Sequence, residues 1–157
     1  MARIFKSTER FLQPDPRYGN MIVSKFINCM MWKGKKAVSQ KIFYNAMDII
    51  ENKVKEEKPL AVFLAALENV KPMIEVRSRR VGGQNLQVPV EVSSKRRQSL
   101  GIRWMLDAMR SGKGKPAHEK LAGEILAAYK KEGTAITKRE NVHKMAEANK
   151  AFAHFAW

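Results

Sequence analysis

The strongest constraint on the fold is an alternating stretch at 71–97, interrupted by a Gly82-Gly83 pair. Apolar residues recur at every second position before and after the glycines, and basic residues crowd the turn and the far end. A period of two is typical of β-strands, and paired glycines between two such runs are typical of a tight turn. The stretch therefore predicts a β-hairpin at about 73–92 that directs arginines away from a core.

The register of this hairpin depends on the length of its loop. A two-residue turn at 82–83 would pair Val76 with Pro89 and set apolar side chains opposite polar ones. A three-residue loop at 82–84 would pair Val76 with Val90, so that the apolar faces match. We therefore expect the longer loop, or a bulge near it, and an edge strand at Pro89.

The remaining sequence has helical periodicity and helix-boundary residues. Asn20 is a good N-cap, Pro59 suits a first helical turn, and Thr137 to Glu140 has the capping-box pattern. The expected helices lie at 20–34, about 36–55, 59–71, 93–112, 116–133 and 137–151. The predicted fold is mainly α: a six-helix domain with a protruding β-hairpin between the third and fourth helices. We expect a basic N-terminal arm at 1–18, a single helical domain at 19–151 and an aromatic tail at 152–157.

The charge of the chain indicates its class of partner. The 157 residues include 30 Lys and Arg against 15 Asp and Glu, a formal net charge of +15. Charge of one sign at this density favours a polyanionic partner, with nucleic acid first and an anionic membrane second. No run approaches the roughly 18 apolar residues of a membrane span, and no signal peptide is evident. We therefore expect no membrane partner.

The residues required for catalysis are scattered. The three histidines lack metal-ligand spacing, the acidic residues are dispersed, and the chain has no paired-cysteine or phosphate-loop motif. The single cysteine, Cys29, lies in an apolar run and is expected to be a small core residue in a reducing compartment. We expect no enzymatic activity, cofactor, metal or small-molecule substrate.

The candidate RNA contacts are basic residues at positions where a phosphate is the best partner. Those at 95–97 are unusual at a helix start, where positive charge opposes the helix dipole. Arg96, Arg103 and Arg110 fall seven residues apart and share one helix face. The full set is Arg3, Lys6, Arg10, Lys33, Lys35, Lys36, Arg77, Arg79, Arg80, Lys95, Arg96, Arg97, Arg103, Arg110, Lys138, Arg139, Lys144 and Lys150.

Several motifs, in order along the chain, resemble one known family. They are PDPRYGN, KFINCMMWKGKK followed by IFYNA, ALENVKP, EVRSRRVGG, QVPVEV, the RR and RW pairs, and GTAITKRENVHKMAEANKAFAHFAW. Together they cover about 14–157 and are similar to the bacterial or organellar ribosomal protein seven of the small subunit. Lys33 stands where an acidic residue is common in that family, and it adds a candidate phosphate contact.

The resemblance implies six helices with a long hairpin between the third and fourth. It also implies a primary binder of small-subunit ribosomal RNA that docks on the 3′ major domain and starts assembly of the subunit head. Such a protein lies at the subunit interface near the exit site, contacts transfer RNA and the messenger RNA path, and neighbours small-subunit proteins nine and eleven. The implied location is the cytoplasmic ribosome, or the stroma or matrix of an organelle.

Two other interpretations of the residues remain. The first is a free-standing basic helical nucleic-acid-binding protein, either an RNA chaperone or a DNA-compacting protein, for which a dimerising apolar stripe is expected. The second is a nuclease or RNA-modifying enzyme, for which clustered acidic residues or a metal site are expected.

Overall fold

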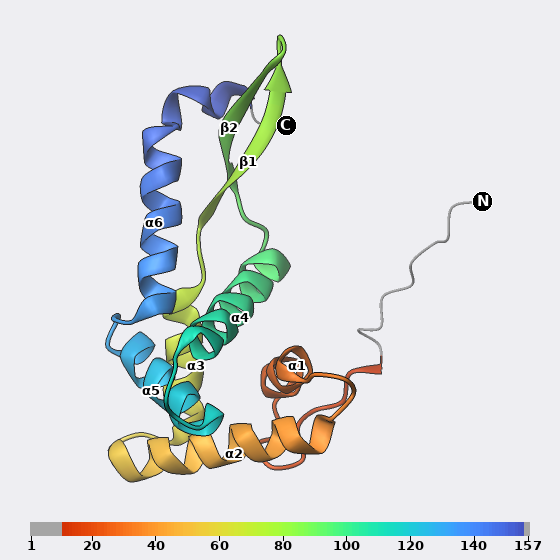
Figure 1. The fold of residues 1–157 in the computed structure, drawn as a ribbon, viewed down its shortest axis with the longest axis vertical. Coiled ribbons are helices and arrows are strands. Elements are labelled where there is room, and N and C mark those ends of the chain that lie inside the picture. Colours follow the sequence, from red (N-terminus) through yellow and green to blue (C-terminus); the bar gives the residue numbers. More distant parts are fainter. Residues whose placement is uncertain (1–10, 156–157) are drawn as a thin grey trace, which may run out of the picture.

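The computed structural model describes residues 11–155 and is mainly helical (Figure 1). The elements in chain order are α1 (Met21–Met30), α2 (Lys36–Lys53), α3 (Pro59–Val70), β1 (Ile74–Val81), β2 (Gln84–Glu91), α4 (Ser94–Ser111), α5 (Ala117–Tyr129), α6 (Thr134–Ala148) and the 3-10 helix η2 (Lys150–Phe155). A two-stranded antiparallel hairpin lies between α3 and α4, as predicted. No helix within residues 11–155 has the length and apolar character that crossing a membrane requires.

The helix boundaries follow from local backbone chemistry. Asn20 caps α1 by accepting hydrogen bonds from the N–H groups of Ile22 and Val23, and Pro59 opens α3, both as predicted. The prediction for the sixth helix was wrong at its start. Gly133 has a φ of +94°, which only glycine adopts readily, and it allows α6 to begin at Thr134. The Thr137 hydroxyl is therefore inside the helix, where it donates to the Gly133 carbonyl oxygen.

Three helices were predicted to be too long, and one of them is the fifth helix, which ends at Tyr129 rather than at 133. The first helix ends at Met30 rather than at 34, because Met31 already has a non-helical ψ of 137°. Lys33 and Gly34 follow in left-handed conformations with φ of +49° and +75°. The sixth helix ends at Ala148, and the chain continues as η2.

Three fully buried phenylalanines join the first three helices. The ring of Phe43 on α2 lies 5.6 Å from that of Phe26 on α1 and 5.3 Å from that of Phe63 on α3, between ring centroids. All three side chains are 0% exposed. Tilted and edge-to-face rings at these separations attract one another beyond the gain from burial alone. Helix α5 packs against α2, α3 and α4, so one core links the helical body.

The inner end of the predicted basic arm is anchored to α2. The buried Asp15 carboxylate accepts a hydrogen bond from the Tyr44 hydroxyl at 2.8 Å and from the backbone N–H groups of Arg17 and Tyr18. Arg17 also forms an ion pair with Asp48 at 2.6 Å. Burial, together with the bond to Asp15, raises the pKa of Tyr44 to about 12. These contacts fix the path of the chain into α1.

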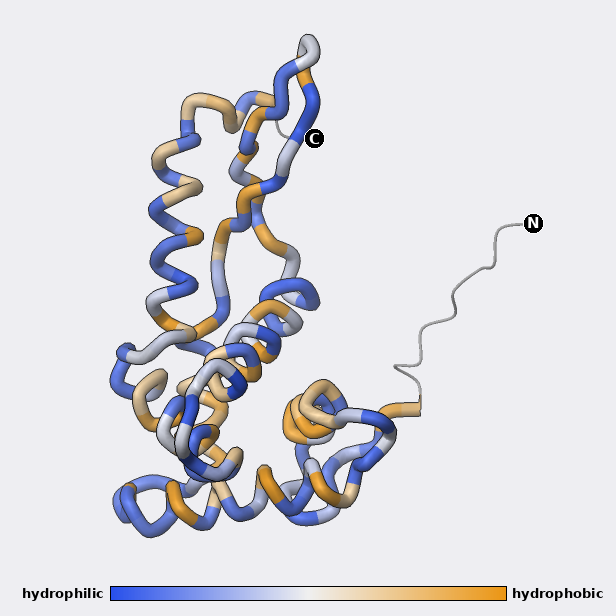
Figure 2. Tube along the Cα trace, in the orientation of Figure 1, coloured by the Kyte–Doolittle hydropathy of each residue, from blue (hydrophilic) through white to orange (hydrophobic). Residues whose placement is uncertain are grey.

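The predicted hairpin register was wrong. The turn has two residues, and Val76 pairs with Pro89. Both Gly82 and Gly83 have positive φ, at +55° and +87°, which suits the tight turn that matches the twist of a hairpin. The strands alternate between hydrophobic and hydrophilic residues (Figure 2), and the register sets the apolar side of β2 opposite the arginines of β1. Turn chemistry therefore decides the register, which places Arg77 opposite Val88 and Arg79 opposite Leu86.

The C-terminal segment lies alongside the hairpin (Figure 1). Helix α6 contacts β1, and η2 contacts β2. The ring Nε2 of His143 on α6 accepts a hydrogen bond from the Met73 N–H at 3.2 Å, just before β1 begins. Arg79 donates a hydrogen bond to the Phe155 carbonyl oxygen in η2. The hairpin is thus supported over part of its length by the end of the chain.

Replacing Phe63 by Ala should destabilise the fold by about 3–5 kcal/mol, because it removes a fully buried ring and leaves a cavity against Phe26 and Phe43. Urea unfolding followed by circular dichroism measures this loss. Met145→Ala, at a side chain that is 51% exposed, is the control and should change stability by less than about 0.5 kcal/mol. Equal effects of the two changes would contradict the assigned core.

Candidate nucleic-acid interface

The outer face of α4 carries three arginines in a row. Arg96, Arg103 and Arg110 are exposed, whereas the opposite side of the helix is buried and includes Leu100 and Trp104. Residues seven apart are almost two helical turns apart, so successive arginines are separated by roughly 10 Å along the axis. Helix α4 therefore holds three cationic groups in a line on a rigid support.

A buried carboxylate fixes the arginines at the hairpin end of this line. Glu75 on β1 is only 7% exposed. One of its oxygens lies 2.5 Å from Nη2 and 2.7 Å from Nε of Arg77, and the other accepts from Nε of Arg96 at 3.2 Å. The two guanidinium groups are about half-exposed and keep further donors for a phosphate. Glu75 thus joins the hairpin to the start of α4 and orders two candidate contacts.

The environment of Glu75 changes its acidity. Burial by itself raises the pKa of this carboxyl group, but the hydrogen bonds from Arg77 and Arg96 outweigh burial and hold the pKa below its ordinary value of 4.5. Glu75 is therefore ionised at neutral pH, and its pair with the two arginines stabilises the fold under those conditions.

The other end of α4 meets the turn between α1 and α2. Nη2 of Arg110 donates to the Met30 carbonyl oxygen at 3.3 Å, and its guanidinium carbon lies 5.4 Å from the centre of the Trp32 ring. Exposed Lys33, Lys35 and Lys36 follow at the start of α2, which has no acidic residue in its first turn. Positive charge here opposes the helix dipole, and a bound phosphate relieves that conflict.

These side chains form one continuous surface, which we call the basic strip. It runs from the hairpin along α4 to the α1–α2 turn and consists of Arg77, Arg96, Arg103, Arg110, Lys33, Lys35 and Lys36. Exposed Lys95 and half-buried Arg97 lie beside its upper end on the first turn of α4. The Nε of Arg97 is buried and has no hydrogen-bond partner among the described residues.

Cys29 lies beside the strip and corrects one sequence-based expectation. It is exposed rather than a core residue. Helix α1 buries one face, with Phe26 and Ile27, and leaves Cys29 on the other, where it borders a small hollow with Arg103 and Arg110. Because the residues around Cys29 are nearly all apolar, the sequence did not show which face of α1 is buried and which is exposed.

The candidates on the last helix have more contacts within the protein. Lys138 forms an ion pair with Asp107 of α4 at 3.2 Å. Arg139 donates to the Asn69 carbonyl oxygen at the end of α3 and lies 3.7 Å from Glu140. Lys144 and Lys150 are exposed on α6 and η2, outside the basic strip. This group thus lies apart from the basic strip and includes two side chains that link helices.

The remaining candidates are divided between the hairpin and the N-terminus. Arg79 contacts η2 through Phe155, whereas Arg80 is exposed near the hairpin tip. Arg3, Lys6 and Arg10 lie outside the described residues.

Sequence reasoning missed two residues of the interface. Glu75 received no role, and its Arg96 partner is 21 positions away in the sequence. Trp32 received no role, although an aromatic residue beside a lysine cluster is a signal for nucleic-acid binding. Within residues 11–155, no group of three or more His, Cys, Asp or Glu side chains is arranged to hold a metal ion.

A helical body with one cationic strip and a projecting arginine-bearing hairpin defines a basic helical protein with a surface for a polyanion. Residues 2–150 match the family model described as ribosomal protein S7p/S5e, and the chain belongs to this family. It is similar to the small ribosomal subunit protein uS7 of Thermotoga neapolitana, with 57% identity over 97% of both chains. The proteins of the same name from Rhodopirellula baltica and a Caulobacter species are 56% and 54% identical over the full length of each chain.

Family membership confirms the resemblance seen in the sequence motifs. The chain is a structural, RNA-binding protein of the small ribosomal subunit and not an enzyme. The basic strip is therefore the candidate surface for ribosomal RNA.

Replacing Glu75 by Gln should lower the free energy of unfolding by about 1.5 kcal/mol at pH 7, because charge-assisted hydrogen bonds to two arginines are weakened. The folded-state pKa of Glu75 lies below 4.5, so this contribution is complete above that pH and disappears as the pH falls through the lower value. Urea unfolding of both proteins between pH 7 and pH 3 should show the difference shrinking in acid.

Glu91→Gln provides the matched control, since Glu91 is an exposed carboxylate on the other strand of the hairpin. It should leave stability nearly unchanged at every pH. A difference between wild type and Glu75→Gln that is constant with pH would contradict the assigned role of the charge, because Gln keeps the shape of Glu and removes only its ionisation.

Proposed function

We propose that the chain is a primary binder of small-subunit ribosomal RNA, which docks on the 3′ major domain and nucleates assembly of the subunit head. The observation that carries this proposal is the basic strip. A line of arginines on a rigid helix, ordered at one end by Glu75 and at the other by the Met30 carbonyl, is suited to successive phosphates of a folded RNA. Ordering before binding reduces the entropy lost on association.

We further propose that the two parts of the molecule bind different RNAs. The helical body carries most of the strip, whereas the hairpin projects away from it (Figure 1). Arg80 is exposed near the hairpin tip, where the glycines of the turn add no side-chain bulk. In this proposal the body holds ribosomal RNA, and the hairpin reaches exit-site transfer RNA and the messenger RNA path at the subunit interface.

Two protein neighbours and a location complete the proposal. Small-subunit proteins nine and eleven are the proposed neighbours, on the strength of family membership. The chain acts on the ribosome, in the cytoplasm or in an organelle.

The proposal is tested by comparing three nucleic acids of equal length: the 3′ major domain fragment of small-subunit ribosomal RNA, a scrambled RNA and duplex DNA. Filter binding across a salt series should show tight binding to the first alone, with a steep fall of log K as log salt rises. A free-standing RNA chaperone or DNA-compacting protein would bind all three alike, and that result would overturn the proposal.

Within the same series, Arg103→Ala should weaken binding to the ribosomal RNA fragment and lower the salt slope by roughly 0.7–0.9, because one phosphate contact is lost. Lys130→Ala is the control: Lys130 is an exposed cation at the end of α5, away from the strip. An equal loss of slope in the two variants would show that only total charge matters and that the strip is not the site.

The hairpin tip gives a separate expectation. Arg80→Ala should leave stability and binding to the ribosomal RNA fragment unchanged, because Arg80 is exposed and beyond the helical body. It should weaken retention of exit-site transfer RNA on reconstituted small subunits, measured by filter binding of labelled transfer RNA. Unchanged transfer RNA retention would remove Arg80 from the proposed contact.

A further inference from the structure

Phosphate binding does not explain one feature beside the basic strip. Trp32 lies in the turn between α1 and α2 with 67% of its surface exposed. Cations alone are sufficient to bind phosphates, and a large exposed aromatic side chain in this position adds only apolar surface. Exposed aromatic rings are typical of sites that bind an apolar or flat partner.

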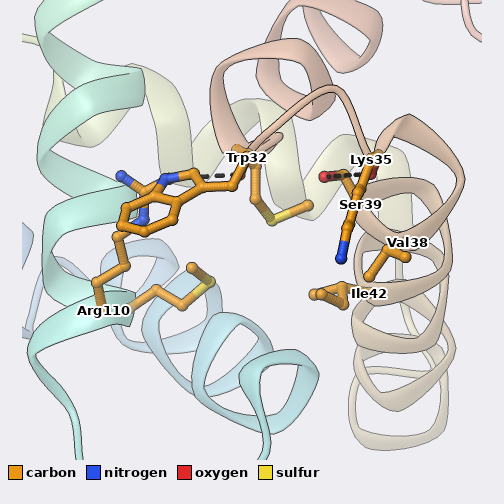
Figure 3. A pocket seen from close by; sticks show the side chains of 8 residues that line it. Trp32, Lys35, Val38, Ser39, Ile42 and Arg110 are labelled. Atoms are coloured by element: carbon orange, nitrogen blue, oxygen red, sulfur yellow. Dashed lines mark hydrogen bonds between the residues drawn. The ribbon is translucent and has the colours of Figure 1, made fainter.

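Trp32 makes one backbone contact and one side-chain contact. The Trp32 carbonyl oxygen accepts a hydrogen bond from the Lys35 N–H at 3.0 Å, which closes the turn. The guanidinium of Arg110 lies against the ring and is itself bound to the Met30 carbonyl (Figure 3). The backbone of the turn is therefore closed and Arg110 lies beside the ring, while much of the indole remains open to solvent.

A groove of about 410 Å³ opens beside this ring. Its walls are mainly apolar, and its charged groups are the cations of Lys35 and Arg110 (Figure 3). The hydroxyl of Ser39, which also lines the groove, already donates to the Lys35 carbonyl oxygen. The lining residues are Met30, Trp32, Lys35, Val38, Ser39, Ile42, Met109 and Arg110. The volume falls within the range of about 300–1,000 Å³ that small-ligand sites occupy.

The charge of the groove selects its occupant. An apolar cavity bordered by two cations, with Lys33 and Lys36 exposed nearby, fits a ligand that is flat and apolar in one part and anionic in another. A nucleotide combines these two properties. The groove between the hairpin and α6 is different, because Glu91 and Glu147 are among its lining residues and repel phosphate.

We propose that this groove holds an unstacked nucleobase of the bound RNA, with the base against the indole of Trp32 and its phosphate at Lys35. The inference rests on the proposed binding of ribosomal RNA and adds a stacking subsite to the basic strip. RNA loops and bulges offer bases that are splayed out of the helix, and aromatic side chains recognise them by stacking.

Two substitutions at Trp32 separate stacking from simple apolar contact. Trp32→Leu keeps an apolar side chain but removes the aromatic face, and should weaken binding to the 3′ major domain fragment at least about 5-fold. Trp32→Phe should retain most of the affinity. Neither change should alter the salt slope, whereas Lys35→Ala should lower it by roughly 0.7–0.9. Circular dichroism verifies that all three variants fold.

Met145→Ala is the control, since Met145 is an exposed apolar residue on α6, outside this groove. It should bind like the wild type. Wild-type affinity in Trp32→Leu, or equal losses in the Leu and Phe variants, overturns the stacking subsite. If wild-type chain still binds the fragment specifically and with a steep salt slope, the proposed function stands while the subsite fails. Normal RNA affinity in Trp32→Leu combined with poor incorporation into the subunit would assign the groove to a neighbouring protein instead.

A fluorescence measurement provides a second readout. In a chain with Trp157→Phe, the remaining tryptophans are the exposed Trp32 and Trp104, which is only 6% exposed. RNA binding should quench the emission of Trp32, and the quenching should vanish when Trp32→Phe is added. Quenching that persists in the double variant overturns the subsite.

Discussion

The structure depends on the contact of Phe43 with Phe26 and Phe63, which fixes three helices around one point. This contact sets the angle of α1 and α2, and thereby the position of the turn that carries three lysines and Trp32. Helix α5 packs against the same core and positions α4, so the two ends of the basic strip are placed by one set of buried side chains. The placement of a binding surface that is spread over several elements therefore depends on one hydrophobic core.

Repulsion between like charges is the main force that such a surface must overcome. Two different groups counter it. The Glu75 carboxylate, largely removed from solvent, neutralises part of the charge where the hairpin meets α4. A neutral carbonyl group, that of Met30, holds Arg110 without reducing the net charge offered to RNA. The upper end of the strip is thus ordered by a pH-sensitive contact and the lower end by one that does not titrate.

The sequence predicted the helical fold and the place of the hairpin because periodicity, N-caps and prolines are local signals. The sequence-based prediction failed where the conformational preference of a glycine competed with a pattern of residue types. Matching apolar faces favoured a three-residue loop, yet Gly82 and Gly83 supply the left-handed conformations of a two-residue turn, and this turn sets the register. The start of α6 was missed because the conformation of Gly133 outweighs a capping-box pattern at Thr137.

Some functional residues could likewise be predicted from local signals, whereas others depend on contacts between elements. Arginines seven apart on α4 could be read as one face, because helical geometry is regular. Glu75 could not be assigned, since its role depends on a residue from another element. The exposure of Cys29 and Trp32 depends on which side of α1 and its turn the core occupies, and a nearly continuous apolar run does not reveal that side.

The glycine turn at the end of the hairpin has an evolutionary consequence. Apart from its chain neighbours, a Cβ atom at Gly82 or Gly83 would meet no heavy atom of residues 11–155 within 4 Å, so both positions have ample space. Their positive φ angles nevertheless penalise almost every other residue. Natural selection can therefore retain both glycines for their backbone conformation alone. Their presence in relatives would then reflect the left-handed φ angles of the turn as much as binding to a partner.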